Sequence, residues 1–185
     1  MVVSLTEEQQ MIRENVLRIC SDFDDNYWLA RDEDGRFPED FCLALAEAGY
    51  LGIAMPEEFG GSGLGITEAA VMVQAISESG AANGGVSSVS INVFGANPIV
   101  QYGTDEQKQR WLPPIMRREE RACFAVTEPD AGLDTSQIST RAVRNGDHYI
   151  VHGQKIWMTT AQVADKIMLI ARTAPKEETD SPIDG

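Results

Sequence analysis

The residues best suited to bind a ligand lie in two short stretches, the first of which spans residues 123 to 134. It reads Cys-Phe-Ala-Val-Thr-Glu-Pro-Asp-Ala-Gly-Leu-Asp, an apolar run that breaks into a turn of small residues. Pro129 biases the residue before it toward an extended backbone, and Gly132 permits a left-handed or closely approached backbone. Such a turn exposes N–H groups that can form an anion-binding nest. The alternative is an ordinary strand-to-loop turn, and turn chemistry also accounts for Glu128 and Asp134 without a catalytic role.

The second stretch, residues 153 to 160, reads Gly-Gln-Lys-Ile-Trp-Met-Thr-Thr. If it continues a strand, alternation puts Trp157 and Thr159 on one face. An indole and a hydroxyl on one face can stack on and hydrogen-bond to one flat ligand, although a buried core tryptophan is the alternative explanation. Together the two stretches offer ring-edge donors, pyrophosphate donors and a stacking surface, as a flavin dinucleotide needs.

Other kinds of site find less support in the sequence. The glycine-rich stretch 60–65 lacks a GxGxxG spacing, because Ile66 stands where the last glycine is required. No GK[ST] follows, so we expect a flexible connector. The cysteines and histidines show no disulfide framework and no zinc spacing, and we expect no metal site; they are Cys20, Cys42, Cys123, His148 and His152.

Charge and hydropathy limit the partners and the location of the protein. The net charge of −14 opposes general binding to nucleic acid or to anionic membranes. No apolar run approaches the ~20 residues that span a bilayer. The first residues lack the basic start of a signal or transit peptide. We therefore expect a soluble, cytoplasmic protein.

The first 120 residues read as helices. Thr6 and Thr104 each precede a glutamine by three residues, a spacing that matches capping boxes at helix starts. A polar break at residues 32–35 separates a first helix from a second that begins near Pro38. The pair Pro113-Pro114 is expected to disturb the helix that starts after Thr104.

The pattern changes near residue 121 to short runs typical of strands, at residues 122–127, 138–144, 147–157 and 166–172. Asn145-Gly146 predicts a type I′ hairpin. The fold class is therefore α+β, with an all-α domain over residues 1–120 followed by an incomplete small β-barrel or sheet domain over residues 121–185. A sheet that stops after these strands leaves an open edge, so the sequence reads as unfinished.

Residues 124–133 with residues 153–159 resemble the flavin-binding signature of the acyl-CoA dehydrogenase family. The stretches 55–65 (Met-Pro-Glu-Glu-Phe-Gly-Gly-Ser-Gly-Leu-Gly) and 103–108 (Gly-Thr-Asp-Glu-Gln-Lys) are also similar to that family, so the resemblance covers the whole chain. It implies FAD as the cofactor. It also implies a C-terminal helical bundle, with the catalytic glutamate, that these 185 residues do not contain. No catalytic residue is therefore expected in this chain, and the chain alone is expected to be inactive because the catalytic base is missing.

The resemblance implies roles for individual residues around the flavin. Val126 and Thr127 would contact the pyrimidine side of the ring. Gly132 and Leu133 would lie beside the pyrophosphate. Leu133 would also lie at the entrance for the CoA thioester, which makes it the expected substrate-binding residue, and it stands where many members have serine. The full set of expected cofactor-binding residues is Phe124, Ala125, Val126, Thr127, Gly132, Leu133, Trp157, Met158 and Thr159.

On the second stretch, the resemblance implies that Trp157 packs against the isoalloxazine and that Thr159 donates its hydroxyl to the ring nitrogen that receives the hydride. The implied reaction of the intact enzyme is oxidation of an acyl-CoA thioester to the 2,3-enoyl-CoA, with electrons passing to an electron-transfer flavoprotein. The intact enzyme would be a dimer or tetramer. The alternatives are an acyl-CoA oxidase or flavin-dependent monooxygenase on the same fold, or a non-catalytic interaction module.

Overall fold

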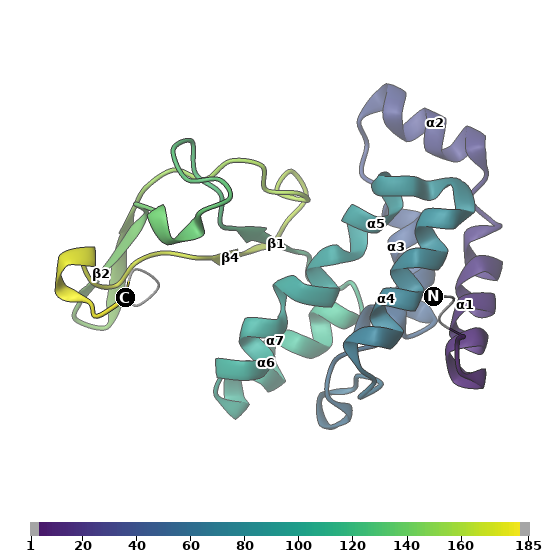
Figure 1. Cartoon of the computed structure of the whole chain (residues 1–185), viewed down its shortest axis with the longest axis horizontal. Helices are drawn as coiled ribbons and strands as arrows, with labels where there is room; N and C mark the ends of the chain where they lie inside the picture. Colours follow the sequence, from purple (N-terminus) through teal and green to yellow (C-terminus); the bar gives the residue numbers. More distant parts are fainter. Residues whose placement is uncertain (1–3, 182–185) are drawn as a thin grey trace. The chain divides into compact units, whose positions relative to one another are not determined.

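The computed structural model describes residues 4–181 and divides the chain into two compact units, Met1–Arg121 and Ala122–Gly185 (Figure 1). The first unit is helical, and the second carries the strands. A helical region followed by a few strands of a small sheet is the α+β fold class that the sequence predicts, and that prediction is confirmed.

The described part of the first unit is built from short helices joined by tight turns. Turns of 3-10 type lie at Tyr50–Gly52 and Glu57–Phe59, and π-type turns lie at Ser77–Ala81 and Ile91–Gly95. The α-helices are α1 (Glu7–Cys20), α2 (Asp25–Asp34), α3 (Glu39–Glu47), α4 (Ile66–Ile76), α5 (Ala82–Ser90), α6 (Asn97–Tyr102) and α7 (Asp105–Met116).

Both predicted capping boxes are present. The Thr6 hydroxyl accepts from the Gln9 N–H at 3.2 Å while the Gln9 side chain accepts from the Thr6 N–H at 3.1 Å. Thr104 and Gln107 repeat the arrangement at 3.2 and 2.9 Å at the start of α7. Each cap satisfies two N–H groups that the first helical turn leaves without partners, and an N-cap hydroxyl contributes about 1 kcal/mol.

Two helix predictions are wrong in detail. Helix α2 was not expected, because none of its side chains is fully buried and its sequence shows no regular apolar stripe. It is fixed instead at its ends, where the Asp24 carboxylate accepts from the Tyr27 N–H at 2.9 Å and Gly35 closes the helix with a left-handed φ of 67°. Helix α7 continues through Pro113 and Pro114 to Met116, so the prolines do not end it.

The core of the first unit lies where α1 and α4 pack together with α3. Val16, Phe41, Leu45 and Met72 are fully buried there. The Phe41 ring also meets those of Phe23 and Trp28 edge-on, at centroid distances of 5.3 and 5.0 Å, and these buried aromatic contacts bring α2 onto the core.

Over residues 122–181, the second unit contains two two-stranded sheets. Strand β1 (Ala122–Ala125) pairs in parallel with β4 (Lys166–Leu169), and β2 (Arg141–Asn145) pairs antiparallel with β3 (His148–His152). An isolated bridge between Arg141 and Arg172 connects the start of β2 to the segment that follows β4. The segments between the strands carry the two stretches predicted to bind a ligand.

The second hairpin strand is shorter than predicted, since β3 ends at His152 and residues 153–157 are not strand. The turn type also differs. Asn145 pairs with His148, so Gly146 and Asp147 form the loop, and of these two only Gly146 has a positive φ, 68°. That φ pattern belongs to a type II′ turn, whereas type I′ requires positive φ at both positions.

Candidate functional site

The two predicted stretches lie side by side in the second unit, held by hydrogen bonds to the main chain. The Ile156 N–H donates to the Thr127 carbonyl at 2.9 Å. One residue earlier, Lys155 Nζ donates to the Val126 carbonyl at 2.8 Å. Residues 155–156 therefore run along residues 126–127, and Trp157 follows directly after this junction.

A buried ion pair lies beneath the junction. Lys155 Nζ lies 2.9 Å from Glu128 Oε1, and both side chains are 5% exposed. The other carboxylate oxygen of Glu128 accepts from the Ser139 N–H at 2.6 Å and from the Ser139 hydroxyl at 2.7 Å. Glu128 Oε1 also accepts from the Thr140 N–H at 2.8 Å. Both oxygens are thus fully engaged, as a buried charge requires.

The surroundings of Glu128 keep it ionised. Burial alone would raise the pKa of this carboxyl. The hydrogen bonds from Thr140, Lys155 and Ser139 to the charged form outweigh burial and hold the pKa of Glu128 far below its ordinary value. Glu128 is therefore a fixed negative charge and has no means to act as a general base or acid near neutral pH.

The turn after Glu128 presents main-chain donors to solvent. Glu128 and Ala131 exchange hydrogen bonds at 3.0 and 3.2 Å, which closes the turn. Within residues 4–181, the N–H groups of Gly132 and Leu133 donate no hydrogen bond. Leu133 is fully exposed, and a Cβ on Gly132 would meet no atom within 4 Å. The backbone here is open to a ligand, although Gly132 does not use a positive φ.

Trp157 has a strained backbone and an exposed side chain. Its φ is 57°, the left-handed region that bulky residues rarely occupy, and its side chain is 84% exposed. Thr160 also lies in that region, at φ 75°, and is buried. This exposure is not that of a core tryptophan. Strain of this kind persists where the surroundings impose it, and it clusters at functional sites.

The nine expected cofactor residues fall into three places. Phe124 and Ala125 lie in β1, and Val126 and Thr127 follow at the junction. Gly132 and Leu133 lie in the turn, and no hydrogen bond between described residues joins them to the Trp157 segment. The remaining residues, which complete the second stretch, are Trp157, Met158 and Thr159.

Two parts of the sequence reasoning about this site are corrected by the structure. The argument that alternation places Trp157 and Thr159 on one face fails, because their segment is not a strand. The roles of Glu128 and Lys155 were missed altogether. A signal was present, because Lys155 is the one basic residue in a stretch of apolar and small neighbours, and Glu128 is fixed in an extended backbone before Pro129.

The glycine-rich stretch of the first unit is a connector, but main-chain hydrogen bonds fold it where a flexible segment is expected from the sequence. Its N–H groups are used internally: those of Gly61, Ser62 and Gly63 donate to the carbonyls of Pro56, Gly52 and Met55 at 3.1, 3.0 and 2.8 Å. A phosphate loop would need these donors free. The three cysteines are buried and unpaired, and among the described residues no group of side chains could hold a metal ion.

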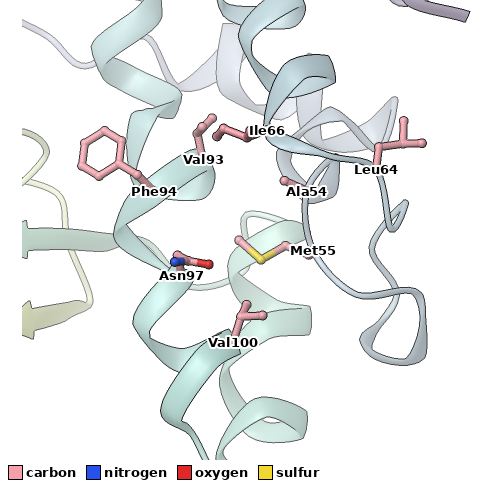
Figure 2. Close-up of a pocket in the computed structure, with 8 residues that line it drawn as sticks. All are labelled: Ala54, Met55, Leu64, Ile66, Val93, Phe94, Asn97 and Val100. Carbon is pink, nitrogen blue, oxygen red and sulfur yellow. The ribbon is translucent and has the colours of Figure 1, made fainter.

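The first unit contains an apolar pocket of about 300 Å³ (Figure 2). One wall comes from residues 54–66 and the other from the chain around α6. Asn97 is the polar residue of the lining, and Figure 2 shows its amide directed toward Met55. The lining residues are Ala54, Met55, Leu64, Ile66, Val93, Phe94, Asn97 and Val100. Such a pocket suits an apolar chain.

The second unit fits a flat cofactor with an anionic tail. The indole of Trp157 is exposed, and within the described part of the chain neither hydroxyl of Thr127 and Thr159 makes a hydrogen bond. The free N–H groups of Gly132 and Leu133 add donors for an anion. A stacking surface and unused donors are what a flavin with its pyrophosphate requires.

Comparisons with known proteins agree with this fold. The acyl-CoA dehydrogenase N-terminal domain model matches residues 6–119, and the acyl-CoA dehydrogenase middle domain model matches residues 123–183. The chain therefore belongs to the acyl-CoA dehydrogenase family, and its fold is a flavoprotein fold. Among the described residues, no helix is both long and apolar enough to cross a membrane.

The relatives are longer than this chain. The probable acyl-CoA dehydrogenase YngJ of Bacillus subtilis is 34% identical over 174 residues, which cover 94% of this chain and 46% of the relative. A solved structure of the electron transferring flavoprotein of Acidaminococcus fermentans matches with a TM-score of 0.85 and 36% identity, over 96% of this chain and 46% of that one. The chain thus spans about half the length of its relatives.

A third comparison concerns the cofactor. The FAD complex of PigA matches with a TM-score of 0.85 and 28% identity, over 95% of this chain and 46% of that chain. Together with the family match, this neighbour supports FAD as the cofactor.

Proposed function

We propose that this chain forms the FAD-binding part of an acyl-CoA dehydrogenase. The observation that carries the proposal is the hydrogen bond from the Ile156 N–H to the Thr127 carbonyl, 2.9 Å long. It joins the first predicted stretch to the second, so that donors and an exposed indole lie on adjoining segments. The domains would then be a helical one over residues 1–120 and a flavin-binding one over residues 121–185.

Each expected residue has a task in this proposal. Val126 and Thr127 hydrogen-bond the pyrimidine side of the ring, and the N–H groups of Gly132 and Leu133 bind the pyrophosphate. Trp157 packs on the ring, and the Thr159 hydroxyl, unpaired within residues 4–181, donates to the ring edge. The remaining three residues line the same flavin-binding site with backbone and side-chain atoms: Phe124, Ala125 and Met158.

The reaction that we propose for the intact enzyme is oxidation of an acyl-CoA thioester to the 2,3-enoyl-CoA. When bound, FAD supplies the hydride acceptor. The residues of this chain bind and orient it, and a hydroxyl at its edge favours the negative charge that reduction adds. No catalytic base is assigned here, because the carboxylate that the structure places at the junction, Glu128, is buried and fully hydrogen-bonded.

The substrate and partners follow from the same proposal. Leu133 would lie at the entrance for the CoA thioester. Taken by itself, the apolar pocket of the first unit suits an acyl chain. We propose an electron-transfer flavoprotein as the electron acceptor and a dimer or tetramer as the intact assembly. These statements concern an enzyme about twice the length of this chain.

The experiment is a flavin titration of the purified chain. FAD is added, free flavin is removed by gel filtration, and the visible absorbance of the protein peak is recorded. Wild type should retain flavin, whereas Thr127→Val and Trp157→Ala should each retain several-fold less. If wild type retains no more flavin than an unrelated protein of the same size, the proposal is wrong.

A further inference from the structure

We propose that Glu128 and Lys155 are positioning residues that clasp the two flavin-binding stretches together. They would touch no ligand. Their task is to hold Thr127 beside Ile156, and so to fix where Trp157 is presented. We call the ion pair of Glu128 and Lys155, with its hydrogen bonds to residues 126, 139 and 140, the clasp. The inference rests on the proposed function only for the identity of the ligand, because these contacts lie within the protein.

The contacts of Lys155 show which groups it joins. Its ammonium donates to the Val126 carbonyl at 2.8 Å and to Glu128 Oε1 at 2.9 Å. Both acceptors belong to the first stretch, while Lys155 itself lies in the second. The Lys155 side chain therefore links the two stretches, next to the hydrogen bond from the Ile156 N–H to the Thr127 carbonyl.

The contacts of Glu128 extend the clasp to a third segment. Its carboxylate accepts from Ser139 through two donors and from the Thr140 N–H. Residues 139–140 lead directly into β2, so the same carboxylate links the turn, the hairpin and the Trp157 segment. A buried charge network of this kind is rigid when all its members are satisfied, and removing one member leaves an unpaired charge.

Burial separates this role from direct ligand binding. A lysine near a predicted pyrophosphate site invites the interpretation that it binds phosphate as a point charge. The Lys155 side chain is only 5% exposed and is already paired with a carboxylate. The charge of Lys155 is therefore neutralised by Glu128 inside the protein. The donors available to an anion at the turn are the main-chain N–H groups of Gly132 and Leu133.

The position of the clasp in the chain explains its relevance to the site. Glu128 follows Thr127 directly, and Lys155 lies two residues before Trp157. The left-handed φ of 57° at Trp157 is unfavourable for an aromatic residue and needs neighbours that impose it. Once the clasp is broken, the segment is free to relax, and the indole no longer stands at a fixed distance from Thr127.

Amide hydrogen exchange on the flavin-free chain tests the clasp without any cofactor. The Ile156 N–H reports the junction, and the Ile170 N–H, which donates to the Ala125 carbonyl at 3.0 Å, reports the β1–β4 pair as an internal reference. In Lys155→Met and Glu128→Gln, Ile156 should lose about tenfold or more of its protection while Ile170 changes little. Lys155→Arg keeps the charge and should lose less.

Two results would overturn the clasp. One is unchanged protection of Ile156 in both Lys155→Met and Glu128→Gln. The other is equal loss at Ile156 and Ile170, which would make the ion pair a general stabiliser of the unit. If Lys155→Met or Glu128→Gln unfolds completely, the milder Lys155→Arg decides: it should lose protection at Ile156 and keep it at Ile170, and equal loss at both would overturn the clasp.

A flavin titration then tests the consequence for binding. Lys155→Met and Glu128→Gln should weaken FAD binding about tenfold or more. The matched control is Glu39→Gln, which breaks the 3.0 Å ion pair with buried Arg118 in the first unit and should leave flavin affinity unchanged. Unchanged affinity in the clasp variants, beside a lost Ile156 protection, would refute the positioning role. If wild type binds no FAD, the proposed function fails, yet the exchange experiment still decides the clasp.

Discussion

The backbone of Gly153 passes so close to Thr140 that a Cβ at residue 153 would lie 2.6 Å from the Thr140 Cβ. It would also lie 2.7 Å from the Thr140 Cα. This approach occurs directly after β3, where the second stretch leaves the hairpin. The Thr140 N–H donates to the Glu128 carboxylate. Gly153 therefore places the chain next to the hydrogen-bonded group that contains Glu128 and Lys155. Glycine is required here for space, because its φ is not left-handed.

The first prediction is that Gly153→Ala destabilises the second unit. The added methyl group would meet backbone and Cβ atoms of Thr140, which have no free rotation to give way, so we expect a cost of about 1–3 kcal/mol. Urea unfolding followed by tryptophan fluorescence measures it. Gly132→Ala is the control, since nothing lies within 4 Å of its Cβ position. Equal stability of Gly153→Ala and wild type would contradict the close approach.

The second prediction separates stability from binding at Trp157. Glycine tolerates the φ of 57° that an indole-bearing residue does not, so Trp157→Gly should keep or raise the unfolding free energy, by up to about 1 kcal/mol. The same change removes the exposed ring and should weaken FAD binding about tenfold or more, as stacking on an aromatic ring contributes about 1–3 kcal/mol per base. A thermal melt and a flavin titration measure the two effects. A large loss of stability would show that the indole is structural.

The sequence predicts the local elements of this chain well, because their signals are local. The capping residues Thr6 and Thr104 satisfy N–H groups three residues away, and both are present as predicted. Helix α2 was missed since its stability comes from its ends and from rings that contact Phe41, far along the chain. A local pattern carries no information about such partners.

In the candidate site, too, local features could be predicted from the sequence and contacts between distant residues could not. Its two stretches could be recognised as segments, whereas their joining depends on Lys155 reaching Val126 and Glu128 across some 27 to 29 residues of chain. The end of β3 at His152 could not be predicted either. Ile156 and Trp157 are residue types that favour a strand. The close approach at Gly153 and the left-handed backbone of Trp157 take this segment out of the sheet.

The third prediction concerns the pocket of the first unit. If it holds the acyl chain, Val93→Phe should fill part of its volume of about 300 Å³ and weaken octanoyl-CoA binding several-fold, as measured by calorimetric titration. FAD binding should not change, because none of the expected flavin-binding residues lines this pocket. Val100→Ala, which enlarges the same pocket, is the matched variant and should not block the ligand. Equal octanoyl-CoA affinity in wild type and Val93→Phe would exclude the pocket as the acyl site.

The fourth prediction is a pH dependence carried by Glu128. Its pKa in the folded chain is lowered from the ordinary glutamate value, so below that value the unfolded state binds more protons than the folded state. The stabilisation from the Glu128 carboxylate is therefore complete above its pKa in the unfolded chain. It is lost as the pH falls from that value toward the pKa of the folded chain.

In Glu128→Gln this titration is absent. The difference in unfolding free energy between wild type and Glu128→Gln should be constant near neutral pH and should shrink from about pH 5 downward. Urea unfolding at a series of pH values measures the difference, with Asp130→Asn, which removes an exposed carboxylate of the same unit, as the comparison. A difference that stays the same down to the acid end would mean that the Glu128 carboxylate is not held in its charged form by Lys155, Ser139 and Thr140.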